Sequence, residues 1–207
     1  YTKFDLKIKN AVSKNIYIKN IYLNLIGRHN VLNAAAAISL CLSLGLKENV
    51  IKKALKNFSG VQRRLTKVFK KNKVEFYDDY AHHPTEIESV LEGVRTVAAK
   101  RKIISVFQPH RYSRIKSLKL EFASSFKNSN QVILCPMYAA GEPNDRTYNK
   151  KKFAQLISKF SKTQVILIES EIELNKYLKK NLIKDEIVIG MGAGSISGWM
   201  HNLKNNL

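Results

Sequence analysis

Residues 74–107, VEFYDDYAHHPTEIESVLEGVRTVAAKRKIISVF, contain the pattern that decides the fold. The first four of these residues are typical of a strand, and residues 86–99 carry apolar side chains at the spacing of an amphipathic helix. Thr85 and Glu88 have the spacing of a capping box, which predicts that the helix begins there. The last five residues are again short and apolar, so the stretch predicts a strand–helix–strand unit.

The alternation of strand and helix continues along the chain. We expect further strands at residues 132–135, 165–168 and 187–189, and helices near residues 117–128, 153–160, 174–178 and 196–203. Before residue 74, a run from Leu65 to Phe69 and a polar turn predict a hairpin that adds one antiparallel strand. We therefore expect residues 59–207 to form a doubly wound α/β domain, whose mostly parallel sheet has about five parallel strands plus one antiparallel edge strand.

The first 58 residues follow a different pattern. Residues 4–25 contain short alternating apolar runs that are typical of strands, and helices are expected at residues 29–44 and 50–58. So few elements do not readily enclose a core of their own. We expect residues 1–58 to be the end of a preceding domain, and Tyr1 to be a cut end.

Composition favours a globular protein with a strong positive charge. The chain has 207 residues, of which 44% are hydrophobic, and its 36 lysines and arginines against 16 acidic residues give a net charge of +20. The lysines are scattered and lack an interleaved aromatic platform, so we expect no nucleic-acid partner. No apolar stretch is long enough for a bilayer span, so we expect no membrane association. Two cysteines in apolar runs favour a reducing compartment, the cytoplasm.

The few arginines are more informative than the many lysines. The chain has 28 lysines but only 8 arginines, and half of the arginines lie in two short segments: Arg63, Arg64, Arg111 and Arg114. A guanidinium group can hold two oxygens of a carboxylate or phosphate at once, which a lysine cannot do. This placement indicates an anionic ligand.

Polar residues also gather where the predicted strands end. The segments are DDYAHHP at 78–84, QPHRYSR at 108–114, PMYAAGE at 136–142 and GMGAGS at 190–195. In a doubly wound sheet, ligands bind beyond the carboxyl ends of the strands. The sequence therefore predicts one site that these loops share.

Simpler interpretations apply to some of these residues. The pair Asp78 and Asp79 alone would be typical of a turn. The neighbours His82 and His83 lack a further ligand at zinc spacing, so no metal site is predicted. The two glycines of 192–194 are explained equally well by tight strand-to-helix packing. No G-x-x-x-x-G-K-[ST] sequence occurs, so a nucleoside triphosphate would need its phosphate loop from outside these residues.

Six segments, in this order, resemble the Mur ligases of bacterial cell-wall synthesis. They are GRHNVLNA at 27–34, FSGVQRR at 58–64, DDYAHHPTE at 78–86, FQPHRYSR at 107–114, YAAGE at 138–142 and GAGSI at 192–196. Each segment is weak alone, whereas the ordered set is specific.

The resemblance implies a three-domain enzyme with a UDP-sugar-binding domain, a central ATPase domain and a C-terminal α/β domain. Residues 1–58 would then be the C-terminal part of the central ATP-binding domain, and residues 59–207 the C-terminal domain. The segments are most similar to those of the family member that joins L-alanine to UDP-N-acetylmuramate, using ATP and an acyl-phosphate intermediate. The UDP-binding domain, the P-loop and the magnesium ligands would lie upstream, so we expect these residues alone to be inactive.

The resemblance also implies roles for individual residues. Asn30 and Asn33 would contact the adenine of ATP, Asp79 would lie on the ribose side, and Arg64 would reach the phosphates across a domain cleft. The acyl phosphate and carboxylate would be held by His110, Arg111 and Arg114, and the catalytic residues would be these three together with Arg64. The amino-acid pocket would be bordered by Tyr80 and His83.

Two alternatives stay open at this point. One is the related ligase that joins a recycled tripeptide to the same sugar nucleotide, which Ala81 slightly favours. The loop at 109–114 favours the L-alanine enzyme over it. The other alternative is a non-enzymatic basic α/β module that binds polyanions, with an affinity that falls steeply with salt.

Overall fold

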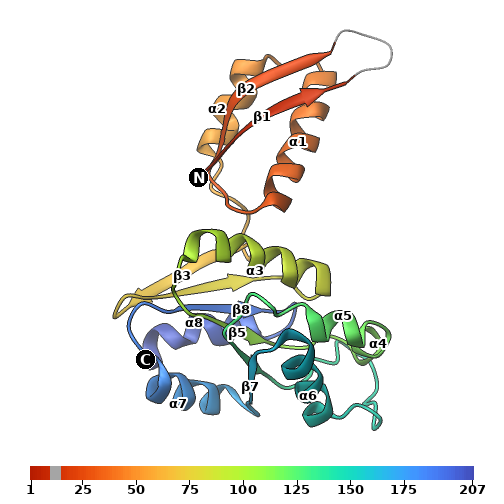
Figure 1. The fold of residues 1–207 in the computed structure, drawn as a ribbon, viewed down its shortest axis with the longest axis vertical. Helices are drawn as coiled ribbons and strands as arrows, with labels where there is room; N and C mark the ends of the chain where they lie inside the picture. Colours follow the sequence, from red (N-terminus) through yellow and green to blue (C-terminus); the bar gives the residue numbers. More distant parts are fainter. Residues whose placement is uncertain (10–14) are drawn as a thin grey trace. The chain divides into compact units, whose positions relative to one another are not determined.

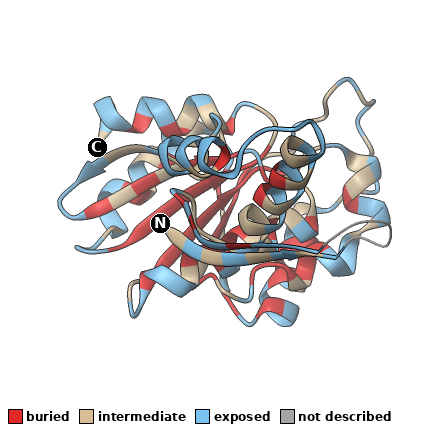
Figure 2. Cartoon of the chain, turned by 90° about the horizontal axis from the view of Figure 1, so that it is seen from above, coloured by how far each residue is buried: buried red, intermediate tan, exposed pale blue. Residues whose placement is uncertain are grey.

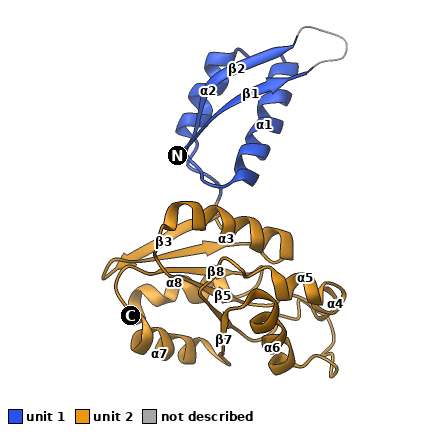
Figure 3. Cartoon of the chain, viewed as in Figure 1, with its two compact units in different colours: residues 1–61 blue, residues 62–207 orange. Residues whose placement is uncertain are grey.

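The computed structural model describes residues 1–9 and 15–207, and the chain divides into two compact units. Unit 1 comprises Tyr1–Val61 and unit 2 comprises Gln62–Leu207 (Figure 3). This division lies three residues beyond the boundary that we expected between residues 58 and 59. The part of the predicted strand region at residues 10–14 lies outside the described residues.

Unit 1 packs two helices on a two-stranded sheet. Its strands β1 (Thr2–Ile8) and β2 (Ile16–Leu23) are antiparallel, and helices α1 (Arg28–Ser43) and α2 (Glu48–Asn57) follow. A small core is formed by Ile18, Ile21, Ile38 and Ile51. Leu40 and Leu44 at the end of α1 are more than half exposed, at 62% and 70%. Unit 1 therefore has an apolar helix face that none of its own described elements covers.

Unit 2 contains the predicted mostly parallel sheet. Its strands are β3 (Thr66–Lys71), β4 (Val74–Asp79), β5 (Ile103–Phe107), β6 (Gln131–Leu134), β7 (Gln164–Leu167) and β8 (Ile187–Met191). Their order in the sheet is β3-β4-β8-β5-β6-β7, and only the β3–β4 pair is antiparallel. The five parallel strands and the single antiparallel edge strand are as predicted.

Helices cover both faces of this sheet (Figure 1). They are α3 (Pro84–Ala98), α4 (Tyr112–Ser117), α5 (Lys119–Ser124), α6 (Lys150–Ser161), α7 (Glu171–Asn181) and α8 (Ile196–Asn206). Leu174 of α7 and Met200 of α8 join one core with Val106 of β5. On the other face, Phe107 of β5 packs against Phe122 of α5. Burial on both faces explains why the central strands β5 and β8 are buried along their whole length; Figure 2 shows buried residues in red.

Two local predictions were wrong. Helix α3 begins at Pro84, with His83 as its N-cap and Glu86 as the capping partner, rather than with a Thr85–Glu88 box. The helix expected at residues 117–128 is two short helices, α4 and α5, that meet at Leu118. Pro84 explains the earlier start, because its fixed φ and missing N–H suit the first position of a helix.

Across residues 1–9 and 15–207, every helix is too short or too polar to cross a lipid bilayer.

Candidate active site

Three neighbouring strands bring the predicted loops to one edge of the sheet. Strands β4, β8 and β5 are adjacent and parallel, in register from Glu75, Ile187 and Ile103 onwards. Their carboxyl ends therefore lie side by side, and the loops after residues 79, 107 and 191 leave the sheet at the same edge. A site built from these loops would receive residues that are far apart in sequence.

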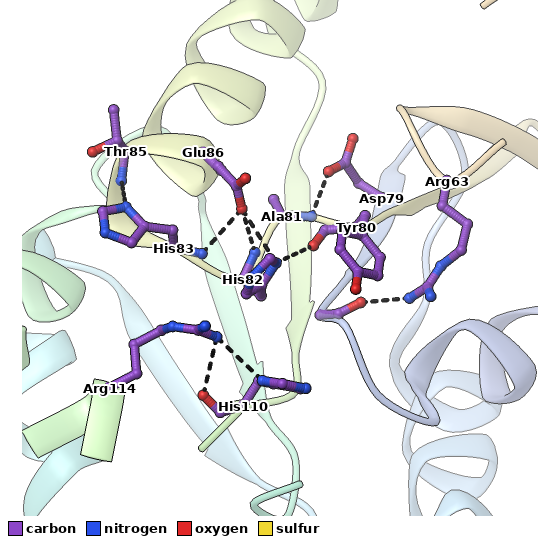
Figure 4. A network of polar contacts seen from close by, with 11 residues as sticks. Arg63, Asp79, Tyr80, Ala81, His82, His83, Thr85, Glu86, His110 and Arg114 are labelled. Carbon is purple, nitrogen blue, oxygen red and sulfur yellow. Dashed lines mark hydrogen bonds and ion pairs between the residues drawn. The ribbon is translucent and has the colours of Figure 1, made fainter. Parts of the chain in front are cut away.

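His110 and Arg114 form a direct pair at this edge. Arg114 Nη1 lies 3.1 Å from His110 Nδ1 and donates to the His110 carbonyl oxygen at 3.4 Å (Figure 4). Burial lowers the pKa of His110, and the positive charges of Arg114, His82 and Arg111 lower it further. The neutral imidazole can accept a hydrogen bond from Arg114, which leaves the guanidinium positioned with donors to spare.

Four aromatic rings from three loops form a row beside this pair. The ring centroids of Tyr80 and His82 are 5.0 Å apart, and those of His82 and His110 are 5.6 Å apart. The His110 ring then stacks on Tyr138, at 5.4 Å and an interplanar angle of 18°. The row fixes His110 between two loops, so His82 and Tyr138 belong to the site although neither was among the predicted site residues.

The predicted site residue His83 lies in the loop after β4, where its side chain caps helix α3. Its Nδ1 accepts from the Thr85 backbone N–H at 3.4 Å. Glu86 Oε2 accepts from the backbone N–H groups of His82 and His83, at 3.0 and 3.2 Å. These contacts rigidly connect the loop after β4 to the start of α3.

The side chain of Asp79 is buried, and it binds backbone N–H groups rather than facing solvent. It is 1% exposed, and its carboxylate oxygens accept from the N–H groups of Leu65 and Ala81, both at 2.7 Å. Burial raises the pKa of Asp79 to about 6, although the two backbone hydrogen bonds and the charge of Arg64 oppose the increase. Arg64 itself is exposed. Asp79 thus fixes the segment that presents Arg64.

Arg63, the neighbour of the predicted Arg64, makes more contacts than Arg64. Its Nη2 donates to the Gly192 carbonyl oxygen at 2.6 Å, and its Nε lies 3.7 Å from Asp78 Oδ2. The guanidinium carbon also lies 4.6 Å from the centre of the Tyr80 ring (Figure 4). The sequence singled out the Arg63–Arg64 pair but did not reveal which arginine faces inward.

Gln108, like His82 and Tyr138, is a residue that sequence reasoning missed. Its amide Nε2 donates to Ser195 Oγ at 3.0 Å, and its Oε1 accepts from the Ile196 N–H at 3.1 Å. A Cβ at Gly194 would lie 2.5 Å from both the Gln108 side chain and the Tyr138 ring. The glycine loop after β8 therefore serves close packing, as the simpler interpretation of these glycines suggested.

Arg111 begins α4 in a left-handed backbone conformation, with φ of 69°. Its N–H donates to the Tyr138 carbonyl oxygen at 2.9 Å, while its side chain is exposed. Glu142 accepts from the Ser113 N–H at 3.1 Å and also from its hydroxyl. The loops after β5 and β6 are thereby joined, with Arg111 at the surface between them.

Asn30 and Asn33 belong to unit 1, on the first turns of α1. Asn30 Nδ2 donates to the Ile26 carbonyl oxygen at 2.7 Å, and Asn33 is exposed. Within the described ranges, no three His, Cys, Asp or Glu side chains converge as a metal site would require. Unit 2 therefore brings together Tyr80, His110 and Arg114, with Arg64 and Asp79 on the adjoining segment, and Arg111 at the rim.

Comparisons with known proteins identify the family of this chain. Residues 63–194 match the family model described as "Mur ligase, glutamate ligase domain". The UDP-N-acetylmuramate–L-alanine ligase of Pelagibacter ubique is 47% identical over 203 residues, which cover 98% of this chain and 44% of that protein. The bifunctional enzyme MurC/Ddl of Chlamydia trachomatis is 40% identical over 94% of this chain and 24% of that protein.

Solved structures give the same result. The UDP-N-acetylmuramate-alanine ligase MurC of Thermotoga maritima has a TM-score of 0.74 and 28% identity, over 90% of this chain and 39% of that one. A murein peptide ligase from Psychrobacter arcticus has a TM-score of 0.70 at 19% identity, over 98% of this chain and 41% of that one, which shows a shared fold. The chain spans less than half the length of these relatives. On the family-model match and the fold, the chain belongs to the Mur ligase family.

Proposed function

We propose that these residues are part of an ATP-dependent ligase that joins L-alanine to UDP-N-acetylmuramate through an acyl phosphate, in cytoplasmic peptidoglycan synthesis. The observation that carries this proposal is the His110–Arg114 pair at the carboxyl edge of the sheet. The 47% identity to the Pelagibacter ligase supports the choice of substrates.

The catalytic role follows from the charge of the reaction. Forming an acyl phosphate and attacking it with an amine places negative charge on phosphate and carboxylate oxygens. Arg111 and Arg114 would hold these oxygens, because a guanidinium group offers two parallel donors. His110, kept neutral by burial and by its cationic neighbours, would orient Arg114 and contact the substrate without adding a repelling charge.

Nucleotide-binding roles are assigned to residues of unit 1 and to residues of unit 2. Asn30 and Asn33 would contact adenine, because an amide can both donate to and accept from a base edge. Arg64 would bind the phosphates from the exposed segment that Asp79 anchors. Asp79, whose buried carboxylate is bound to the Leu65 and Ala81 N–H groups, would serve the ribose side by fixing the segment next to it rather than by direct contact. Tyr80 and His83 would border the amino-acid pocket.

The remaining parts of the enzyme would come from residues outside this chain. The exposed apolar face of α1 supports the assignment of unit 1 to a larger central ATP-binding domain. We place the P-loop and the magnesium ligands in that domain, and UDP-sugar binding in a further one. We therefore expect the 207-residue chain alone to hydrolyse no ATP in the presence of L-alanine.

The two alternatives receive less support. Ala81, the residue that favoured the tripeptide ligase, is fully buried, so it cannot select a substrate by contact. A polyanion-binding module would not require one arginine to be paired so closely with a histidine.

The test is alanine-dependent ADP release by the full-length enzyme. We expect Arg114→Ala to reduce kcat by about 100-fold or more, and Arg114→Lys to restore little, because lysine lacks the planar fork. The matched control is Arg95→Lys, since Arg95 holds the Asn128 carbonyl oxygen at the opposite edge of the sheet. This control should lower the melting temperature and leave turnover unchanged.

Two results would refute the proposal. Turnover with the tripeptide but not with L-alanine would identify the recycling ligase. Normal turnover in Arg114→Ala, together with salt-sensitive binding of RNA by the wild type, would favour the polyanion module.

A further inference from the structure

The side chain of Arg63 contacts two segments that are far from it in the sequence, the end of β4 with its following loop and the loop after β8. It donates to the Gly192 carbonyl oxygen in the loop after β8, and it lies 3.7 Å from Asp78 Oδ2 at the end of β4. It also lies over the ring of Tyr80, in the loop after β4. Its side chain is 28% exposed, so water only partly screens these contacts.

The backbone of Arg63 is fixed as firmly as its side chain. Its carbonyl oxygen accepts from the Tyr80 N–H at 2.7 Å, and two residues later the Leu65 N–H donates to Asp79. Arg63 and Leu65 both have positive φ, at 59° and 49°, a backbone conformation that residues other than glycine rarely adopt. Such backbone strain persists only where surrounding contacts stabilise it, and here the side-chain and backbone contacts of Arg63 do so.

The partner of Arg63 is held in place independently. Asp78 is 1% exposed, and its Oδ2 accepts from the Ser197 hydroxyl at 2.6 Å. A buried carboxylate is a fixed charge that attracts the guanidinium, and Ser197 of α8 keeps it oriented. The arginine therefore links the loop after β4, the loop after β8 and the start of α8.

Tyr80 shows what this linkage does at the surface. Its ring is 36% exposed and has only two ring or cation contacts among the described residues, one to Arg63 and one to His82. A cation on an aromatic face and a hydrogen bond from a charged donor both stabilise the groups that they join. Without the guanidinium, the Tyr80 ring would lose one of the two groups that hold it.

We infer that Arg63 is a positioning residue, whose guanidinium holds Tyr80 and the Gly192 loop in the arrangement that shapes the amino-acid pocket. The inference rests on the proposed function, because Tyr80 is assigned there to the amino-acid side. Arg63 does not touch substrate. It differs in this respect from Arg64, which is assigned to the phosphates.

The experiment compares Arg63→Ala and Arg63→Lys with the wild type in the full-length ligase. We expect Arg63→Ala to raise KM for L-alanine by about tenfold, while KM for ATP changes less than twofold. Tenfold corresponds to about 1.4 kcal/mol, the size of one cation–aromatic or charge-assisted contact. Arg63→Lys should recover only part of the loss, because an ammonium group cannot donate to Gly192 and cover the Tyr80 ring together.

Arg101→Lys is the matched control. Arg101 also makes several contacts, to Glu75 at 2.7 Å and to the Glu186 carbonyl oxygen at 3.2 Å, but at the amino ends of the strands. Weakening it should lower the melting temperature and leave both KM values unchanged. If Arg63→Ala behaves in the same way, Arg63 is merely structural and the inference is wrong.

Hydrogen exchange gives a second readout that does not depend on activity. In Arg63→Ala we expect faster amide exchange in peptides covering residues 80–83 and 192–196, and no such change in Arg101→Lys. Unchanged exchange in these peptides would overturn the inference even if the kinetics shifted. A wild-type enzyme that ignores L-alanine would instead refute the proposed function, whatever Arg63→Ala does to exchange.

Discussion

At the scale of single residues, the environment of His110 disfavours the protonated form of its ring. Burial removes water from the ring, and Arg114, His82 and Arg111 add positive charge around it. The folded pKa therefore lies below that of the unfolded chain. Any stability that depends on neutral His110 is fully present above about pH 6.5 and is lost as the pH falls through the lower, folded pKa.

This leads to a prediction about Arg114→Ala in the 207-residue chain. Removing the guanidinium removes a repulsive charge, so the pKa of His110 should rise toward its ordinary value. NMR titration of the histidine ring protons measures this pKa, with His110→Gln used to assign the signal. Arg95→Ala is the distant control and should leave the titration unchanged. A pKa that falls in Arg114→Ala would contradict the arrangement.

Gly194 allows a second prediction at this scale. A methyl group there would lie 2.5 Å from the ring of Tyr138, whereas a methyl group at Gly198 would meet nothing within 4 Å. We expect Gly194→Ala to lower the free energy of unfolding by about 1 to 3 kcal/mol, as overpacking does. Gly198→Ala, within α8, should be neutral or stabilise by up to about 1 kcal/mol. Urea denaturation of both variants measures the difference, and equal effects would show that the close packing is absent.

At the scale of elements, the start of α3 separates what the sequence revealed from what it did not. The apolar spacing of residues 86–99 correctly predicted a helix and its buried face. The capping residues could not be identified from spacing alone, because Thr85 and Glu88 also have the spacing of a capping box. The observed cap depends on the direction in which Glu86 folds back, and that direction is set by the path of the loop after β4.

The two candidate caps predict different mutational effects. Glu86→Ala removes the acceptor for the His82 and His83 N–H groups, so it should cost about 1 kcal/mol of stability. Glu88→Ala changes an exposed residue and should have almost no effect. Thermal unfolding of the two variants decides between the caps. A larger loss in Glu88→Ala would favour the consensus box.

The site residues, too, divide into those that the sequence revealed and those that it did not. Arg63, Arg64, Arg111 and Arg114 stand out in the sequence, because arginine is scarce in a chain rich in lysine, and His110 stands out by its place in the loop after a predicted strand. The inward contacts of Arg63 and the roles of Gln108 and Tyr138 could not be predicted in this way. Their importance comes from contacts between loops, such as the bond from Gln108 to Ser195, that join residues far apart in the chain.

At the scale of the whole molecule, local pattern predicted the number of strands in unit 2 but not their order. Each strand is recognisable from its own apolar run, whereas pairing depends on which strands meet after the chain has folded. The consequence is that β8, the last strand in sequence, lies between β4 and β5, the second and third strands of the unit. The site loops after β4, β5 and β8 are therefore attached to β8 or to one of its two neighbours, and the loop that carries Tyr138 follows β6, one strand further along the sheet.

This central position of β8 has a consequence for biosynthesis. Until β8 has been translated, β4 and β5 have no strand between them, and their facing edges stay unpaired. A nascent chain can form helices and the β3–β4 hairpin early. The hydrogen bond from Arg63 to the Gly192 carbonyl oxygen, in contrast, forms only after that glycine has been translated. A copy that terminates before β8 would therefore lack the strand that brings the loops after β4 and β5 together.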